Sequence, residues 1–232
     1  MAKISLKKGI LDVVLYIIVF IVAQLVVLYA GAGIWAAVKH EGFQATLQAM
    51  TAGGNPALLA ITTVFSSIIT LVVFLKAKWV VLTRDYLLSK PWFILLWVAL
   101  FTLGAIIPLE FLYEHLGLEM DENTGKLFEG LMKEPWGYVA VGILAPLTEE
   151  IVFRGAILRS LLDMMSKKNH WVAIMISAAM FGLAHGNTAQ FVNALLMGLL
   201  LGWMYYRTKS LVPGILMHWV NNTMAYILAN LV

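Results

Sequence analysis

Two adjacent carboxylates and an arginine stand inside a strongly apolar stretch of the chain. Glu149 and Glu150 precede Arg154, and most of the residues around them are hydrophobic. Residues four apart share one face of a helix, so Glu150 and Arg154 are expected to form an ion pair that offsets the cost of burying both charges. Glu149 is rotated by about 100° from its neighbour and has no partner on its own helix. This spacing predicts a buried carboxylate that is available as a general base.

Two histidines and an asparagine farther along the chain are candidate neighbours of Glu149. His185 closes one apolar stretch, and His218 lies in a later stretch with Asn222 four residues after it. A carboxylate and an imidazole can hold and deprotonate water, while donors such as His218 and Asn222 can stabilise the oxyanion formed on a peptide carbonyl. Hydrolysis by activated water is therefore favoured, because no serine or threonine is evidently paired with a base.

The same residue types also allow a metal site. Glu149, His185 and His218 could bind zinc, with Glu150 acting as the base. Against this reading, the chain contains no His-Glu-x-x-His sequence, and the three ligands would come from separate segments. We therefore expect catalysis without a cofactor, and zinc is the alternative.

Composition indicates that a membrane surrounds these residues. The chain has 232 residues, of which 61% are hydrophobic and 12% are charged, about half of the ~25% that is usual for soluble domains. Several apolar runs exceed the length of about 18 residues that is typical of helices crossing a bilayer. These properties exclude a soluble globular enzyme and a nucleic-acid binder. The absence of cysteine excludes disulfides and a thiol nucleophile.

We predict an all-α, polytopic bundle of about seven transmembrane helices (range six to eight) that forms a single domain, 1–232. The expected spans are Ile10–Val38, Pro56–Leu75, Pro91–Tyr113, Trp136–Met165, His170–His185, Gln190–Tyr206 and Leu211–Leu231. All site motifs fall in a catalytic core of about 136–232, whereas 1–135 has no assigned role. Between spans, Glu41–Ala52 is expected to form a short interfacial helix and Glu114–Pro135 an acidic solvated loop.

Lysine and arginine are distributed unevenly among the predicted connecting segments. If the N-terminus is cytoplasmic, twelve of them fall on the inner side of the membrane and three on the outer side. The positive-inside rule describes this asymmetry. We therefore expect a multi-pass protein of the cell membrane whose N-terminus lies in the cytoplasm.

Three separated motifs occur in order within about Val139–Thr223. They are Glu149-Glu150-x-x-x-Arg154, Phe181-x-x-x-His185 and His218-x-x-x-Asn222. Together they resemble the motifs of the CAAX-protease and bacteriocin-processing family of intramembrane proteases, also called CPBP or Abi proteins.

The resemblance implies an endopeptidase that acts within the membrane. Carried over from the CAAX-processing relatives, the first glutamate and first histidine would activate water, and the last histidine and the asparagine would form the oxyanion hole. These catalytic positions are Glu149, His185, His218 and Asn222, with Glu150 and Arg154 as the supporting pair.

The expected substrate is a membrane-associated peptide or protein in a bacterial cytoplasmic membrane. It would be a bacteriocin or pheromone precursor, or a CAAX-like C-terminus. One alternative is a non-catalytic membrane immunity or scaffold protein that binds a peptide in the same cavity. An ion-coupled transporter is disfavoured because the sequence shows no pair of discontinuous helices.

Overall fold

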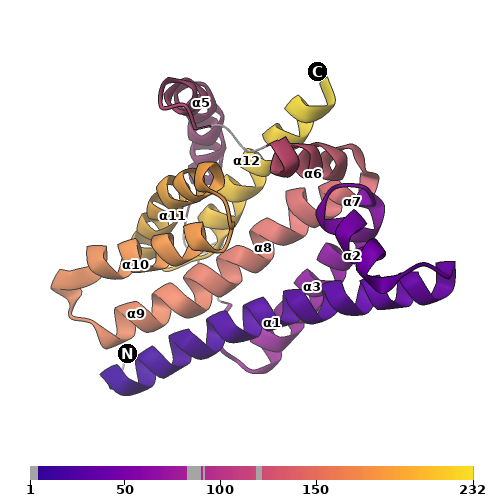
Figure 1. Cartoon of the computed structure of the whole chain (residues 1–232). Coiled ribbons are helices and arrows are strands. Elements are labelled where there is room, and N and C mark those ends of the chain that lie inside the picture. The colour runs from indigo at the N-terminus through magenta and orange to yellow at the C-terminus, as the bar shows by residue number, and fades with distance from the viewer. Residues whose placement is uncertain (1–4, 83–89, 91, 119–121, 232) are drawn as a thin grey trace.

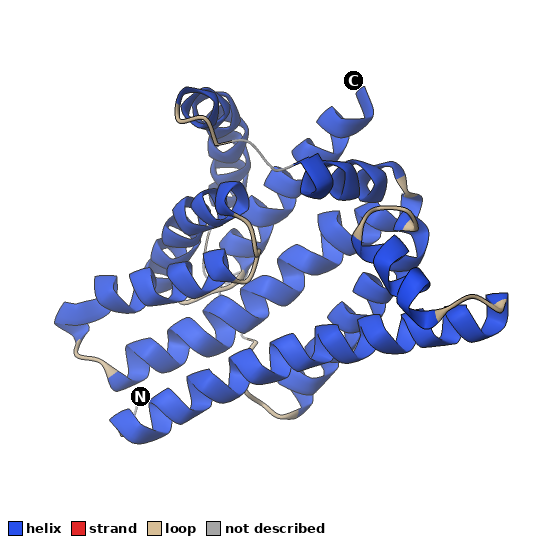
Figure 2. Cartoon of the chain, in the orientation of Figure 1, coloured by secondary structure: helices blue, strands red, loops and turns tan. Residues whose placement is uncertain are grey.

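The structure is a computed structural model that describes residues 5–82, 90, 92–118 and 122–231. Within these residues the chain is helical and contains no strand, as Figures 1 and 2 show. The elements are α1 (Leu6–Lys39), α2 (Phe43–Thr51), α3 (Pro56–Lys76), α5 (Phe93–His115), α6 (Glu122–Lys133), α7 (Pro135–Gly137), η1 (Tyr138–Leu144), α8 (Ala145–Glu149), η2 (Glu150–Leu158), α9 (Arg159–Met164), η3 (Lys167–Asn169), α10 (His170–Leu183), α11 (Thr188–Thr208) and α12 (Val212–Leu231). The predicted all-α class is confirmed.

Capping residues in the sequence set where two of the helices begin. The Asn55 side chain accepts a hydrogen bond of 3.2 Å from the amide of Leu58, and Pro56 takes the first position of α3. The Asn187 side chain accepts a bond of 2.8 Å from the amide of Gln190 at the start of α11. Such caps satisfy amides that the first turn of a helix leaves unpaired. Both helices consequently begin within two residues of the predicted positions.

Four of the described helices, α1, α3, α5 and α11, are long and apolar enough to cross a membrane. They coincide with the first, second, third and sixth predicted spans, and they make the chain a membrane protein. The remaining predicted spans fall on α10, on α12 and on the continuous helix 135–164, which are shorter or contain several polar residues. The count of seven therefore stays a prediction. The expected start of the third span, Pro91, lies outside the described residues.

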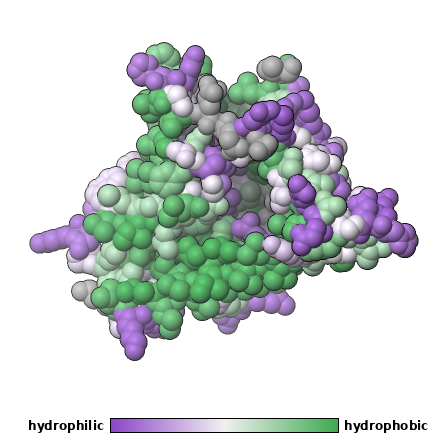
Figure 3. Space-filling model, in the orientation of Figure 1, coloured by the Kyte–Doolittle hydropathy of each residue, from purple (hydrophilic) through white to green (hydrophobic). Residues whose placement is uncertain are grey.

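The outer surface of α1 is what a lipid-facing helix requires. Figure 3 shows a broad band of hydrophobic residues along α1, with hydrophilic residues gathered at the margins of this face. Leu11, Val26 and Ile34 are 65%, 59% and 67% exposed. An apolar surface of this extent is unusual for a protein surrounded by water and is ordinary for one surrounded by acyl chains.

One long helical run, Pro135–Met164, passes through the middle of the bundle (Figure 1). It comprises α7, η1, α8, η2 and α9, with α1 and α3 packed on one side and α10 and α12 on another. Every residue of η2 is buried. The fourth predicted span is thus a single helical run. Its η1 and η2 segments are π-helical, a form that often occurs at functional sites.

The segment predicted as a solvated loop contains a helix instead. Glu122–Lys133 forms α6, on which Lys126 pairs with Glu122 at 2.5 Å and Lys133 pairs with Glu129 at 2.6 Å. Pairs of opposite charge four residues apart stabilise an exposed helix. The loop prediction was wrong because it counted the acids without considering their spacing to the lysines. A helix is present at the other predicted connecting element, where α2 occupies most of 41–52.

Candidate active site

Glu150 and Arg154 meet inside the bundle, as their spacing predicts. Nη1 of Arg154 lies 2.9 Å from Oε1 of Glu150, and each side chain is only 1% exposed. The contact is an ion pair without hydrogen-bond geometry, and Nε and Nη2 of Arg154 have no hydrogen-bond partner in the described structure. The guanidinium carbon instead lies 4.4 Å from the centre of the Phe181 ring. A cation–π contact and one carboxylate therefore compensate this buried charge.

Glu149 finds its partner on the last helix of the chain. Nε2 of His218 on α12 lies 3.5 Å from Oε2 of Glu149, and Nδ1 of the same ring lies 3.4 Å from Oε1 of Glu150. The second contact was not predicted. The His218 side chain is 4% exposed and that of Glu149 is 20% exposed. Of the two acids, Glu149 is therefore the one that reaches open space, as a base that deprotonates water must.

A glycine on α12 allows this close approach. A Cβ atom at Gly214 would lie 2.7 Å from Oε2 of Glu150. That separation is shorter than van der Waals contact, so any larger residue would push α12 away from the carboxylates. Gly214 was not predicted as a site residue, although Pro213-Gly214 one turn before His218 was visible in the sequence.

Asn222 is oriented by a backbone carbonyl that a proline leaves unpaired. The amide of Ala145 donates to Ala140, five residues earlier, as in a π-helix. The next donor in that pattern would be Pro146, which has no N–H. The carbonyl of Val141 therefore lacks a partner within the helix, and Nδ2 of Asn222 donates to it at 2.9 Å. This bond uses one amide hydrogen of Asn222 and leaves the other available.

His185 lies beside the same aromatic ring as His218. Nδ1 of His185 is 2.9 Å from the carbonyl oxygen of Phe181. When Nδ1 donates to that carbonyl, Nε2 is left as an acceptor. Phe181 meets the rings of His185 and His218 edge to face, at centroid distances of 4.9 and 5.7 Å. Within the described residues His185 forms no ion pair with either glutamate. Its cooperation with Glu149 through water stays a prediction.

The geometry does not assemble the alternative zinc ligands. His218 contacts both glutamates, whereas within the described residues His185 forms no ion pair with either of them. In the part of the chain that the structure describes, no three side chains among His, Asp and Glu are grouped to hold a metal ion. No catalytic step through a metal follows from this arrangement.

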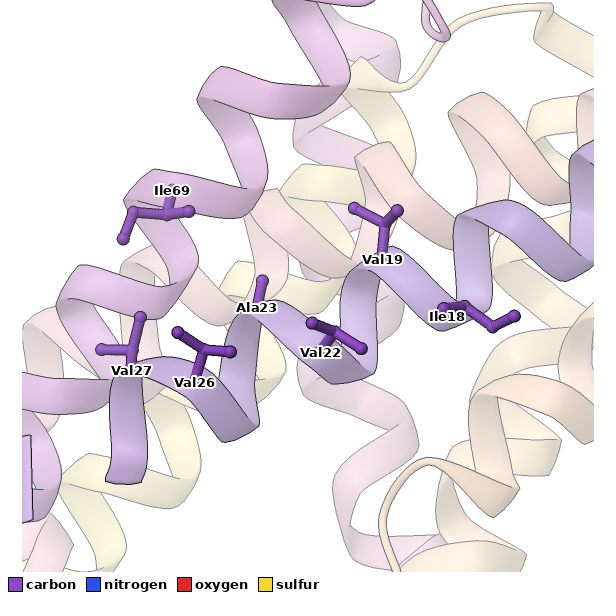
Figure 4. Close-up of a pocket in the computed structure, with 7 residues that line it drawn as sticks. All are labelled: Ile18, Val19, Val22, Ala23, Val26, Val27 and Ile69. Carbon is purple, nitrogen blue, oxygen red and sulfur yellow. The ribbon is translucent and has the colours of Figure 1, made fainter. Parts of the chain in front are cut away.

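A cavity beside the central helix and a groove between α1 and α3 differ in their lining. A cavity of about 60 Å³ reaches Glu149, and its lining is Phe20, Gln24, Thr63, Ser66, Ser67, Thr70, Ala145, Thr148 and Glu149. A groove of about 290 Å³ faces outward and is wholly aliphatic, with Ile18, Val19, Val22, Ala23, Val26, Val27 and Ile69 as its lining (Figure 4). Of these two hollows, only the first contains a candidate catalytic residue, Glu149. The hydroxyl groups of this cavity were not predicted, although five hydroxyl residues within one apolar span were a visible signal.

Comparison with known proteins is consistent with this geometry. Residues 132–224 match the family described as Type II CAAX prenyl endopeptidase Rce1-like. YdiL of Bacillus subtilis (strain 168), an inferred membrane peptidase, is 30% identical over 131 residues, which are 56% of this chain and 52% of YdiL. The Membrane-embedded CAAX protease MroQ of Staphylococcus aureus (strain USA300) is 31% identical over 137 residues, or 57% of this chain and 55% of MroQ.

The chain spans about half the length of these two curated relatives. No solved structure matches it. The matched residues include every predicted catalytic and supporting position, and the resemblance inferred from the three motifs is confirmed. The part of this chain that contains the candidate active site, residues 132–224, is therefore similar to the Rce1-like family of CAAX endopeptidases.

Proposed function

We propose that this protein is a multi-pass endopeptidase of the cell membrane that hydrolyses peptide bonds of a membrane-associated substrate. The observation that supports this most strongly is the contact of Glu149 with His218, which brings together two segments nearly 70 positions apart in the sequence. The match of residues 132–224 to a family of endopeptidases supports the same reading.

In the proposed reaction Glu149 acts as the general base. It accepts a proton from water while the water oxygen bonds to the peptide carbonyl carbon, and His185 holds the same water. The electron pair that moves to the carbonyl oxygen is stabilised by hydrogen bonds from His218 and Asn222. When the C–N bond breaks, the proton on Glu149 passes to the departing amine. One water is consumed for each bond, and no covalent enzyme intermediate forms.

The supporting pair keeps this site in place. Arg154 holds Glu150 by an ion pair, and Glu150 in turn faces Nδ1 of His218. This arrangement orients the imidazole so that Nε2 faces Glu149. A ligand or base orientated by a second carboxylate is a recurrent feature of catalytic histidines.

We further propose that the substrate is a peptide precursor or another membrane-bound protein in a bacterial cytoplasmic membrane, with the N-terminus of the enzyme in the cytoplasm. The relative MroQ is named a membrane-embedded CAAX protease. This name supports the proposal that the substrate of the present chain is also associated with the membrane. A bacteriocin or pheromone precursor and a CAAX-like C-terminus both meet that description.

The purified protein, reconstituted in proteoliposomes with a library of membrane-anchored peptides, tests the proposal. Mass spectrometry should detect two complementary fragments of the cleaved peptide. The His185→Ala variant should lose about a hundredfold or more in rate, the usual contribution of a positioned acid–base group. A protein that binds peptides and never cuts them, with His185→Ala binding equally well, would instead be the scaffold or immunity protein.

Metal removal provides a separate test of the mechanism. Elemental analysis of active protein should find no stoichiometric zinc, and a chelator should leave cleavage unchanged, because Glu149 activates water without a metal in the proposed scheme. Zinc in a one-to-one ratio whose removal stops cleavage would contradict that scheme while leaving the peptidase assignment intact.

A further inference from the structure

A small polar cavity behind Glu149 plays no part in the reaction described above. Its volume is about 60 Å³, and a cavity needs at least about 10–15 Å³ by this measure to hold one water molecule. It lies between α1, α3 and α8, and Glu149 forms part of its lining. The same carboxylate contacts His218 on α12. Glu149 therefore connects this cavity with the histidine side of the site.

Three of the four α3 hydroxyls that line the cavity have their protons engaged by the helix itself. Thr63 donates to the carbonyl of Leu59 at 2.8 Å, and Thr70 donates to that of Ser66 at 2.8 Å. Ser66 donates to the carbonyl of Thr63 at 3.0 Å. The oxygen lone pairs of these hydroxyls remain as acceptors. This side of the cavity consequently offers acceptors to a molecule that can donate.

The opposite side of the cavity holds a hydroxyl that has no hydrogen-bond partner among the described residues. Thr148 is 3% exposed, and its Oγ1 makes no hydrogen bond in the described structure. Leaving a buried hydroxyl unpaired is unfavourable by about 1–3 kcal/mol in general. A small molecule that both donates and accepts hydrogen bonds would satisfy Thr148 together with the acceptors of α3.

We propose that this cavity is a water site that supplies the hydrolytic water to Glu149 from the side of α3. The proposal rests on the proposed peptidase function, because each cleaved bond consumes one water. Ordered water needs two to four polar partners. Thr148, Glu149 and the acceptors on α3 provide that number.

Water access can be measured without any peptidase activity, because the chain has no cysteine. Ser67→Cys introduces a single thiol that lines the cavity, and Ile69→Cys introduces one that lines the aliphatic groove of Figure 4. Silver ion, which is about the size of water and does not enter lipid, is the probe. The thiol that remains is titrated after unfolding, with the unsubstituted protein as the blank.

We expect Ser67→Cys to lose its thiol to silver at least about tenfold faster than Ile69→Cys in proteoliposomes. Equal, slow reaction of both variants would mean that the cavity is dry and would overturn the proposal. Because this readout does not involve cleavage, it gives the same answer whether or not the protein proves to be a peptidase.

The role in supply is tested by Thr148→Val, with Thr62→Val as the matched control. Thr62 is also buried on α3, but it does not line the polar cavity. It lies in a separate, mainly apolar groove between α1 and α3, and it donates to the carbonyls of Leu58 and Leu59. We expect Thr148→Val to lower kcat about fivefold, the effect of one lost hydrogen bond, with KM unchanged. Thr62→Val should leave kcat unchanged.

If the cavity is dry, the expected results for Thr148→Val are different. Removing an unpaired hydroxyl would raise the melting temperature of Thr148→Val and leave kcat alone, and that result would overturn the proposal. A second combination of results would also overturn the proposal: rapid reaction of Ser67→Cys with silver together with an unchanged kcat of Thr148→Val. The cavity would then hold water, but that water would not be the water consumed in cleavage.

Discussion

The same sequence pattern occurs in two regions of this molecule with opposite surroundings. On α6, Glu122 and Glu129 each pair with a lysine four residues later, and all four side chains are at least 59% exposed. On η2, Glu150 pairs with Arg154 four residues later, and both are 1% exposed. The spacing makes the pair in both places, but only burial makes it part of a site. Burial removes water as the competing partner, so each buried charge depends on its neighbours.

Removing the buried cation should have the largest effect on stability. Arg154→Ala leaves the carboxylate of Glu150 buried with only His218 beside it, and we expect a loss of about 3–5 kcal/mol in the free energy of unfolding. Denaturant titration in detergent micelles, followed by circular dichroism, measures this loss. A change below about 1 kcal/mol would mean that the buried pair is no more important to the fold than the pairs on α6.

Adding one methyl group at the contact between α12 and the carboxylates should be the next largest effect. A Cβ at Gly214 would lie 2.7 Å from Glu150, so Gly214→Ala should destabilise the protein by about 1–3 kcal/mol through overpacking. Gly33→Ala on α1, where nothing lies within 4 Å, should instead stabilise it by about 0.5–1 kcal/mol. Destabilisation of the same size by both substitutions would show that the tight approach at Gly214 is not responsible.

Restoring an amide at position 146 should separate activity from stability. Pro146→Ala returns an N–H that competes with Asn222 for the carbonyl of Val141, so the amide of Asn222 loses its fixed orientation. We expect kcat to fall about tenfold, part of the effect of removing an oxyanion donor outright, while the melting temperature stays the same or rises. A fall in melting temperature with unchanged kcat would contradict this positioning role for Pro146.

The smallest effect is expected on α6. A hydrogen bond from Lys133 lowers the pKa of Glu129 below its usual value. The contribution of this pair is therefore present above the ordinary pKa of glutamate and is lost as the pH falls through the lowered value. Because both partners are exposed, Lys133→Ala should leave the melting temperature unchanged within error at pH 7 and pH 4. A clear pH-dependent drop would show that exposure does not weaken the pair.

The helices and the buried ion pair could be predicted from sequence because both depend on local rules. Long apolar runs with caps such as Asn55 define the helices, and the four-residue spacing defines the pair between Glu150 and Arg154. The exposed helix α6 was missed although its pairs obey the same spacing rule. Its acids had been weighed as a solvated charge cluster, without regard to the positions of the lysines.

Contacts between distant segments were predictable only in part. His218 was expected near Glu149 from residue type and depth, but its second contact with Glu150 was not, because it depends on how closely Gly214 lets α12 approach. The bond from Asn222 to Val141 depends on a π-helical turn, and periodicity in the sequence does not distinguish π-helical from α-helical turns. The seven-span count and the single-domain organisation stay predictions.

Cleavage by the Glu149→Gln variant tests the central claim most directly. Glutamine keeps the shape of the side chain but cannot accept the proton of water. In proteoliposomes we therefore predict that kcat falls by about a hundredfold to ten-thousandfold. Glu122→Gln on α6, the same change at an exposed site, should cleave at the unsubstituted rate, and both variants should melt normally. Turnover by Glu149→Gln within a few-fold of the unsubstituted protein would contradict the assignment of Glu149 as the base that activates water.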